Sequence, residues 1–345
     1  MNLKAMFSKR IAGAVLAGLS IAIVGIALLS PHSQWLTDLS PFGTTPTNSI
    51  SGISGRDGPV LVVKIDDTRQ AHPQIGLENA DIVYIEQVEG GLTRLAAVFS
   101  STIPTHVGPV RSARISDIEL LEQYGRVAFA YSGAQKKLRP VIAAANLEDL
   151  GAQNHSATIY TTDINRVQPY AMVLRADLLM KLAQEKNLSI ARSKSMGWSF
   201  GDTPEGGMPI KSVHISWPAN SYDAHWSSKE ERWLLDHSYQ PDVAASGERL
   251  GPTTLVIQLV SITDSMYRDK VGGITPFSAT VGEGRGYILR NGRVYEALWS
   301  RPDASSGTQW KSLAGEEITF ARGQIWVALT DKEPVFTRNS ADAGM

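Results

Sequence analysis

The chain has 345 residues, of which 43% are hydrophobic and 19% charged, so it is long enough for two ordinary domains and is not intrinsically disordered. Lys and Arg total 33 against 34 for Asp and Glu, and this balance gives no bulk attraction for nucleic acid. Cysteine is absent, which excludes disulfides, thiolate metal ligands, cysteine nucleophiles and a lipidated N-terminal cysteine.

An apolar segment without a charged side chain extends from Ile11 to Leu29. Its length approaches the ~20 residues that a helix needs to cross a bilayer. Three bases precede it and none follows before Arg56, so the positive-inside rule predicts a cytoplasmic basic tail over 1–10 and a body on the extracytoplasmic side. We predict a single-pass membrane helix or signal anchor over 11–29, which would make the cytoplasmic membrane a partner. A cleaved signal peptide is the alternative, although its apolar core spans only about 7–15 residues.

Residues 30–58 are rich in Pro, Ser, Thr and Gly and predict a flexible linker. The body after it predicts an α+β protein with a mixed domain over 59–200, a smaller mainly-β domain over 210–331 and a disordered tail over 332–345. Expected strands in the first domain are 60–67, 81–88, 92–100 and 127–131, and expected helices are 112–124 and 171–185. Expected strands in the second are 212–217, 232–235, 254–260, 286–289, 294–299 and 325–329, with Asn291-Gly292 as a tight hairpin turn.

One group of charged residues follows the first strands and comprises Asp66, Asp67, Glu86, Glu89 and Arg94. Strand alternation places Glu86 on a face with bulky apolar residues, where a carboxylate needs a partner. Arg94, beyond the Gly-Gly turn, is the expected partner. This group is either a structural ion network or a ligand site with a carboxylate in a cleft.

Arg111, Ser112 and Arg114 lie at the start of the helix expected at 112–124. First-turn N–H groups lack partners within a helix and the helix dipole is positive there, so an anion would be favoured beside two guanidinium groups. We expect Ser112 to cap the helix. The alternative is that acids of the first group take both arginines and close the network internally.

Other motifs carry less chemistry. The segment Gly282–Gly286 leads into a hairpin rather than a helix, which favours a glycine bulge or tight corner over a phosphate loop. The seven histidines show no metal-ligand spacing, so no metal and no cofactor are expected.

Several motifs together resemble the YerB-like family of bacterial envelope proteins, whose biochemical function is not established. They are residues 63–67 (VKIDD), 72–77 (HPQIGL), 80–84 (ADIVY), 88–94 (VEGGLTR) and 107–114 (VGPVRSAR). The resemblance is specific over 60–117 and looser over 118–330, and it implies an extracytoplasmic protein of two parts.

The chain departs from the family pattern in three ways. It lacks the cysteine that commonly carries a lipid anchor, so the helix would anchor it. It also has His72 where an Arg is usual, and residues 166–171 lack a His-Asn pair. The last two departures favour binding over catalysis. We therefore expect an envelope protein that binds or scaffolds, with an envelope polymer or envelope protein as possible partner. The alternatives are a cell-wall hydrolase using Glu86 as acid or base and a purely structural member of a membrane complex.

Overall fold

The computed structural model describes residues 46–338. The predicted basic tail, membrane helix and first part of the linker lie outside this range. Within it, no helix combines the length and apolar character that a membrane span requires.

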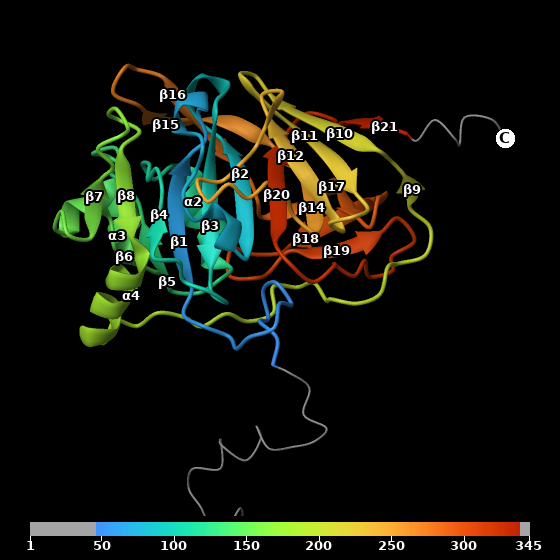
Figure 1. Ribbon diagram of the computed structural model, residues 1–345, viewed down its shortest axis with the longest axis horizontal. Coiled ribbons are helices and arrows are strands. Elements are labelled where there is room, and N and C mark those ends of the chain that lie inside the picture. The colour runs from blue at the N-terminus through green and yellow to red at the C-terminus, as the bar shows by residue number, and fades with distance from the viewer. Residues whose placement is uncertain (1–45, 339–345) are drawn as a thin grey trace, which may run out of the picture. The chain divides into compact units, whose positions relative to one another are not determined.

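A mixed sheet of eleven strands runs through the described residues and joins the N-terminal and C-terminal sections of the body (Figure 1). Strand β20, near the C-terminus, lies between β14 and β2 and is parallel to both. In spatial order the strands are β19 (Gln309–Ser312), β18 (Arg293–Arg301), β17 (Gly282–Arg290), β14 (Thr254–Leu259), β20 (Ile325–Thr330), β2 (Ile82–Gln87), β3 (Thr93–Phe99), β1 (Leu61–Asp66), β5 (Val127–Ala130) and β6 (Leu147–Asp149), with β9 (Met208–Pro209) on β18.

A second sheet of five strands packs on one face of the central sheet. Val213, Ile215 and Trp217 alternate along β10 and point into the core that they share with Ile257 and Trp326 of the central sheet. The order is β13 (Gln240–Pro241), β12 (Arg232–His237), β11 (Asn220–Ser227), β10 (Ser212–Trp217) and β21 (Val335–Thr337).

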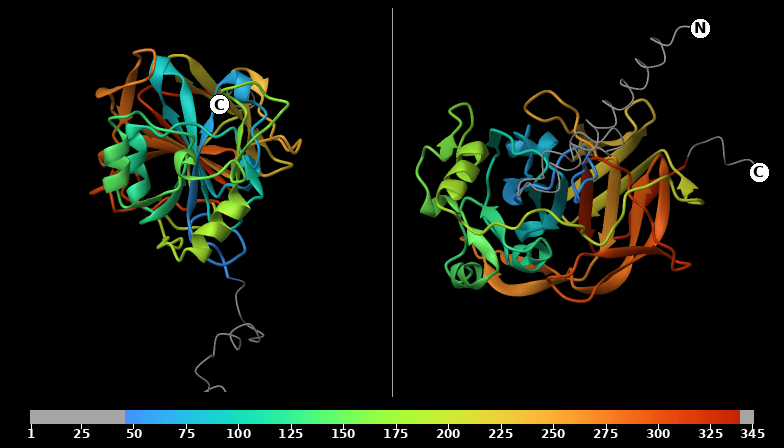
Figure 2. Two further views of the ribbon diagram at one scale, coloured as in Figure 1. Left: turned by 90° about the vertical axis from the view of Figure 1, so that its left-hand side faces the viewer. Right: turned by 90° about the horizontal axis from the view of Figure 1, so that it is seen from below.

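Helices cover both faces of the central sheet within the N-terminal section (Figure 2). Helices α2 (Ile115–Glu122) and α3 (Arg139–Ala144) contribute to the core on the face opposite the second sheet, whereas α4 (Ala176–Glu185) joins the core on the same face. The remaining strands are β4 (His106–Val107), β7 (Tyr160–Thr162) and β8 (Met172–Arg175) in one small sheet and β15 (Ile262–Arg268) and β16 (Ile274–Ser278) in a hairpin arm. Single 3₁₀ turns occupy Arg69–Ala71, Leu77–Asn79, Glu89–Gly91 and Ala152–Asn154.

The body is thus mostly β, and its described α-helices all lie between positions 115 and 185. The predicted helix over 171–185 is wrong in its first part, because Met172–Arg175 forms β8 between β4 and β7. Pairing with two strands overrides the helical spacing of the apolar residues there.

Two segments expected to be irregular are ordered where the structure describes them. Asn48 and Ile50, in the predicted linker, are fully buried against the body. Val335–Thr337, in the predicted disordered tail, pairs with β10 as β21. Both segments pack against the rest of the body, and local composition does not predict these contacts.

The segment Gly282–Gly286 is a regular part of β17 rather than a bulge or corner, and its pairing with β18 continues without interruption. A Cβ atom on Gly284 would lie 2.7 Å from the Trp299 indole nitrogen on β18, so glycine makes room for that ring. The predicted turn at Asn291-Gly292 is confirmed, since both residues have positive φ and connect β17 to β18.

Candidate functional site

Lys64, Glu86 and Asp117 form a buried ion cluster beneath α2. The Lys64 Nζ lies 2.7 Å from Glu86 Oε1 and 2.7 Å from Asp117 Oδ1, and the exposed fractions of the three side chains are 0%, 1% and 0%. Burial raises the pKa of Glu86 to about 7, against the attraction of Lys64. The Glu86 carboxylate is therefore sealed inside the protein rather than placed in a cleft.

The predicted pairing of Glu86 with Arg94 is wrong. The two residues are opposite each other on β2 and β3, but Lys64 reaches Glu86 from β1, on the far side of β3. The residue opposite Lys64 on β3 is Ala96, whose small side chain lets the lysine cross the strand.

The predicted cap at Ser112 is also wrong, because α2 begins at Ile115 with Arg114 as its N-cap residue. The Arg114 backbone N–H donates a hydrogen bond to Asp117 Oδ2 at 2.6 Å. The Asp117 carboxylate thus occupies the helix N-terminus, where the sequence analysis expected that an external anion could bind.

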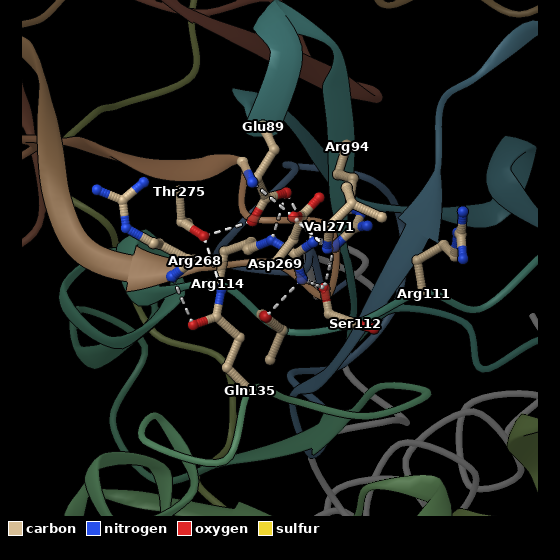
Figure 3. Close-up of polar contacts among 12 residues, drawn as sticks. Glu89, Arg94, Arg111, Ser112, Arg114, Gln135, Arg268, Asp269, Val271 and Thr275 are labelled. Atoms are coloured by element: carbon tan, nitrogen blue, oxygen red, sulfur yellow. Dashed lines mark hydrogen bonds and ion pairs between the residues drawn. The ribbon is translucent and has the colours of Figure 1, made fainter.

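Arg111 and Arg114 both have carboxylate partners. Arg111 pairs with Asp66, and Arg114 donates to Glu89 Oε2 from two nitrogens at 2.9 and 2.7 Å. Thr275 on the hairpin arm donates to the other Glu89 oxygen, and Figure 3 shows the Glu89–Arg114 pair beside it. The internal network that the sequence analysis left open accounts for these two arginines.

Arg94 is different. Within residues 46–338 its guanidinium group makes one hydrogen bond, from Nη1 to the Ser112 carbonyl oxygen at 2.9 Å, and no ion pair. Burial, with the charges of Arg114 and Arg111, lowers the pKa of Arg94 to about 9. The side chain is half-buried, and the neighbouring Arg111 side chain is 20% exposed. Three cations thus share two carboxylates here, which leaves one positive charge without a counter-ion.

Asp67 belongs to another cluster, on the side of the second sheet. One oxygen accepts a hydrogen bond from the Tyr222 hydroxyl group at 2.5 Å, and the other accepts from Asn220 at 3.0 Å and from Thr93. The carboxylate is fully buried. It therefore joins the N-terminal section to β11 in the C-terminal section.

Two histidines complete this second cluster. The rings of His72 and His237 stack with centroids 4.1 Å apart, and His72 Nδ1 lies 3.1 Å from Asp242 Oδ1. Burial lowers the pKa of His72, but hydrogen bonds to Asp242 and Asp67 outweigh it and raise this pKa to about 9. Burial lowers the pKa of His237. At neutral pH the cluster thus holds one protonated and one neutral ring.

The eight predicted site residues therefore separate into four groups: Glu86 in the sealed cluster, Asp66 and Glu89 with Arg111 and Arg114, Arg94 with Ser112, and Asp67 with the histidines. The sequence analysis missed Asp117, His237 and Asp242. The signal that could have identified Asp117 is its acidic side chain at the third helical position after Arg114. No local spacing pointed to the histidine cluster, whose members come from distant segments; Tyr222 and Asp67 are 155 positions apart.

Together, the fold and these clusters define a two-part, mostly β protein whose sections are fastened by buried polar contacts. Residues 45–189 match the profile of the N-terminal domain of a protein of unknown function (DUF3048), and residues 213–327 match that of its C-terminal domain. The chain is 32% identical over 274 residues to a Bacillus subtilis (strain 168) protein named "Putative lipoprotein YerB", covering 78% of this chain and 80% of that one.

The chain belongs to this YerB-like family, as the sequence motifs predict. The crystal structure of YerB from Bacillus subtilis has the same fold. It matches with a TM-score of 0.70 and 19% identity, covering 84% of this chain and 99% of that one.

Proposed function

We propose that this protein is held at the outer face of the cytoplasmic membrane by residues 11–29 and that its body binds an anionic group at Arg94. The apolar segment, its basic flank and the name of the Bacillus subtilis relative as a lipoprotein all support an envelope location. Because this chain has no cysteine, a helix rather than a lipid would anchor it.

The surplus positive charge at Arg94 carries the ligand part of the proposal. A half-buried guanidinium group with one neutral acceptor has donors to spare, and charge-assisted hydrogen bonds to an anion are stronger than those to water. Arg111 adds to the positive charge of this region, since its charge lowers the pKa of Arg94 and its side chain, which lies over the Tyr170 ring at 5.4 Å, remains partly exposed. A phosphate or carboxylate group of an envelope polymer has the chemistry that such a site recognises.

The hydrolase alternative receives no support from Glu86. Its carboxylate is 1% exposed and bonded to Lys64, whereas a general acid or base must come within hydrogen-bond reach of the substrate. A binding or scaffold role fits the arrangement better.

The binding test uses the full chain in detergent, titrated calorimetrically with inorganic phosphate and sulfate at low salt. Arg94→Gln should weaken binding at least tenfold. The control is Arg126→Gln, because Arg126 is paired with Glu148 at the surface and lies in another part of the sheet. Equal affinities in the two variants would reject the site.

The location is tested separately with protease added to intact spheroplasts. The body should be digested while a small N-terminal fragment stays in the membrane fraction after carbonate washing. Full protection of the body, or its recovery in a soluble fraction, would reject the proposed anchor without bearing on the anion site.

A further inference from the structure

Three potential metal ligands converge between the two sections of the body. His72 Nε2 lies 3.5 Å from Asp67 Oδ1, and His237 Nε2 lies 3.8 Å from the same oxygen. All three ligand atoms lie within 4.8 Å of one another. Zinc bonds of about 2.0–2.1 Å in tetrahedral geometry place ligand atoms roughly 3.3–3.5 Å apart. The three ligand atoms could therefore share an ion after a small contraction and a rotation of one of the two stacked imidazole rings.

The surroundings of these atoms match those of a protein metal site. Asp242 accepts a hydrogen bond at His72 Nδ1, which fixes the ring and directs Nε2 toward Asp67. Such a carboxylate on the outer ring nitrogen is the usual support for a metal-bound histidine. The Tyr222 hydroxyl group donates a hydrogen bond to Asp67 Oδ1 and so holds this carboxylate in place.

Three buried polar atoms of the cluster lack hydrogen-bond partners among the residues described. They are His237 Nε2, Gln74 Oε1 and Asp242 Oδ2. A buried polar atom without a partner is unfavourable, so a ligand at this point would be favoured. The Gln74 amide nitrogen lies 3.0 Å from His72 Nε2, and turning the amide by 180° would present Oε1 as a fourth metal ligand.

We propose that a divalent transition-metal ion of the zinc class binds to Asp67 Oδ1, His72 Nε2 and His237 Nε2. Two imidazole nitrogens with one carboxylate oxygen suit zinc and its neighbours, whereas calcium and magnesium prefer oxygen ligands. The ion would displace the proton between His72 and Asp67. Because Asp67 and His72 come from the N-terminal section and His237 from β12, the ion would fasten the two sections together.

The experiment titrates chelator-treated, tag-free full chain in detergent with zinc chloride alone, by calorimetry, and follows the thermal midpoint. One equivalent should bind and raise the midpoint. His237→Ala and His72→Arg should each weaken binding at least tenfold and abolish the rise. His72→Arg keeps a cation between Asp67 and Asp242, so its fold should survive even if the alanine variant is unstable.

The matched control is His225→Ala, which removes a histidine paired with Asp236 on the exposed side of the second sheet. It should bind zinc with unchanged stoichiometry and affinity. The proposal is overturned if the wild-type chain takes up no zinc, or if His72→Arg binds zinc as tightly as the control does. In either case the cluster would be an ion-pair clamp only, and the anion site at Arg94 would be unaffected.

Discussion

Arg94 lies opposite Glu86 in the antiparallel register of β3 and β2, but the Glu86 carboxylate bonds to Lys64 instead. On its other side Arg94 lies opposite Asp66, which pairs with Arg111. Both neighbouring acids are therefore committed elsewhere, and Arg94 keeps its charge without a carboxylate. Strands β1, β2 and β3 thus carry both the buried Lys64–Glu86 pair and Arg94, the arginine without a carboxylate partner.

Glu86→Gln should make stability less dependent on pH. The folded-state pKa of Glu86, about 7, exceeds its ordinary value of 4.5, so this group's contribution is fully present below pH 4.5 and is lost as pH rises through 7. The loss is on the order of 3 kcal/mol at pH 8, and the amide should remove most of it. Urea unfolding of residues 47–338 at pH 5 and pH 8 measures this. The exposed Glu185→Gln is the control and should leave the difference in unfolding free energy between pH 5 and pH 8 unchanged. The same result for Glu86→Gln would count against the buried cluster.

Tyr222→Phe should lower the free energy of unfolding by about 1.5–3 kcal/mol, because it removes a buried hydrogen bond to the charged Asp67. Tyr287→Phe is the matched control, since the Tyr287 hydroxyl group donates to the exposed Glu333. That change should stay within about 0.5 kcal/mol. Denaturant unfolding of both variants decides the matter, and similar losses in the two would mean that Asp67 does not fasten the sections.

Local sequence patterns predicted ten of the 21 strands that the structure describes, but not what joins them. Alternation and β-branched residues identify β1, β2 and β10, and Asn291-Gly292 identifies the β17–β18 turn, because these signals act between neighbours along the chain. The insertion of β20 between β2 and β14 depends on pairing between distant segments, which no local pattern encodes. The same holds for the meeting of His72 with His237.

The sequence analysis singled out residues that lie in polar clusters, but it did not predict how these residues pair. Every expected residue lies at a polar cluster, since charged residues at the ends of buried strands need partners. The choice of Lys64 for Glu86 depends on the small Ala96 between them, and the choice of Asp117 for the helix start depends on where α2 begins. Both are properties of the assembled sheet.

Gly284→Ala should destabilise the body by about 1–3 kcal/mol, because the added Cβ would lie 2.7 Å from the Trp299 indole nitrogen. The emission of Trp299, which is buried, should shift as its ring is displaced. Gly133→Ala serves as control, because a Cβ there meets no atom within 4 Å. Fluorescence-monitored unfolding compares the two, and equal midpoints would show that the ring does not need the glycine.

Residues 47–200 expressed alone should not fold into the native N-terminal section. The fragment lacks β20, which pairs with β2 along Ile82–Ile85, and it lacks Tyr222 and Asn220, which bond to Asp67. An exposed strand edge and an unsatisfied buried carboxylate should make it aggregate or remain protease-sensitive. Limited proteolysis beside residues 47–338 provides the comparison; native-like resistance of the fragment would show that the shared sheet is dispensable.

The most direct test of the account compares the phosphate affinities of Asp66→Asn and Arg94→Gln in the full chain. Removing the carboxylate that neutralises Arg111 should tighten phosphate binding several-fold, and removing the Arg94 charge should weaken it at least tenfold. Opposite shifts in calorimetric titrations at low salt are the predicted result. Unchanged affinity in both variants, or weaker binding in Asp66→Asn alone, would contradict the claim that a surplus arginine charge forms the binding site.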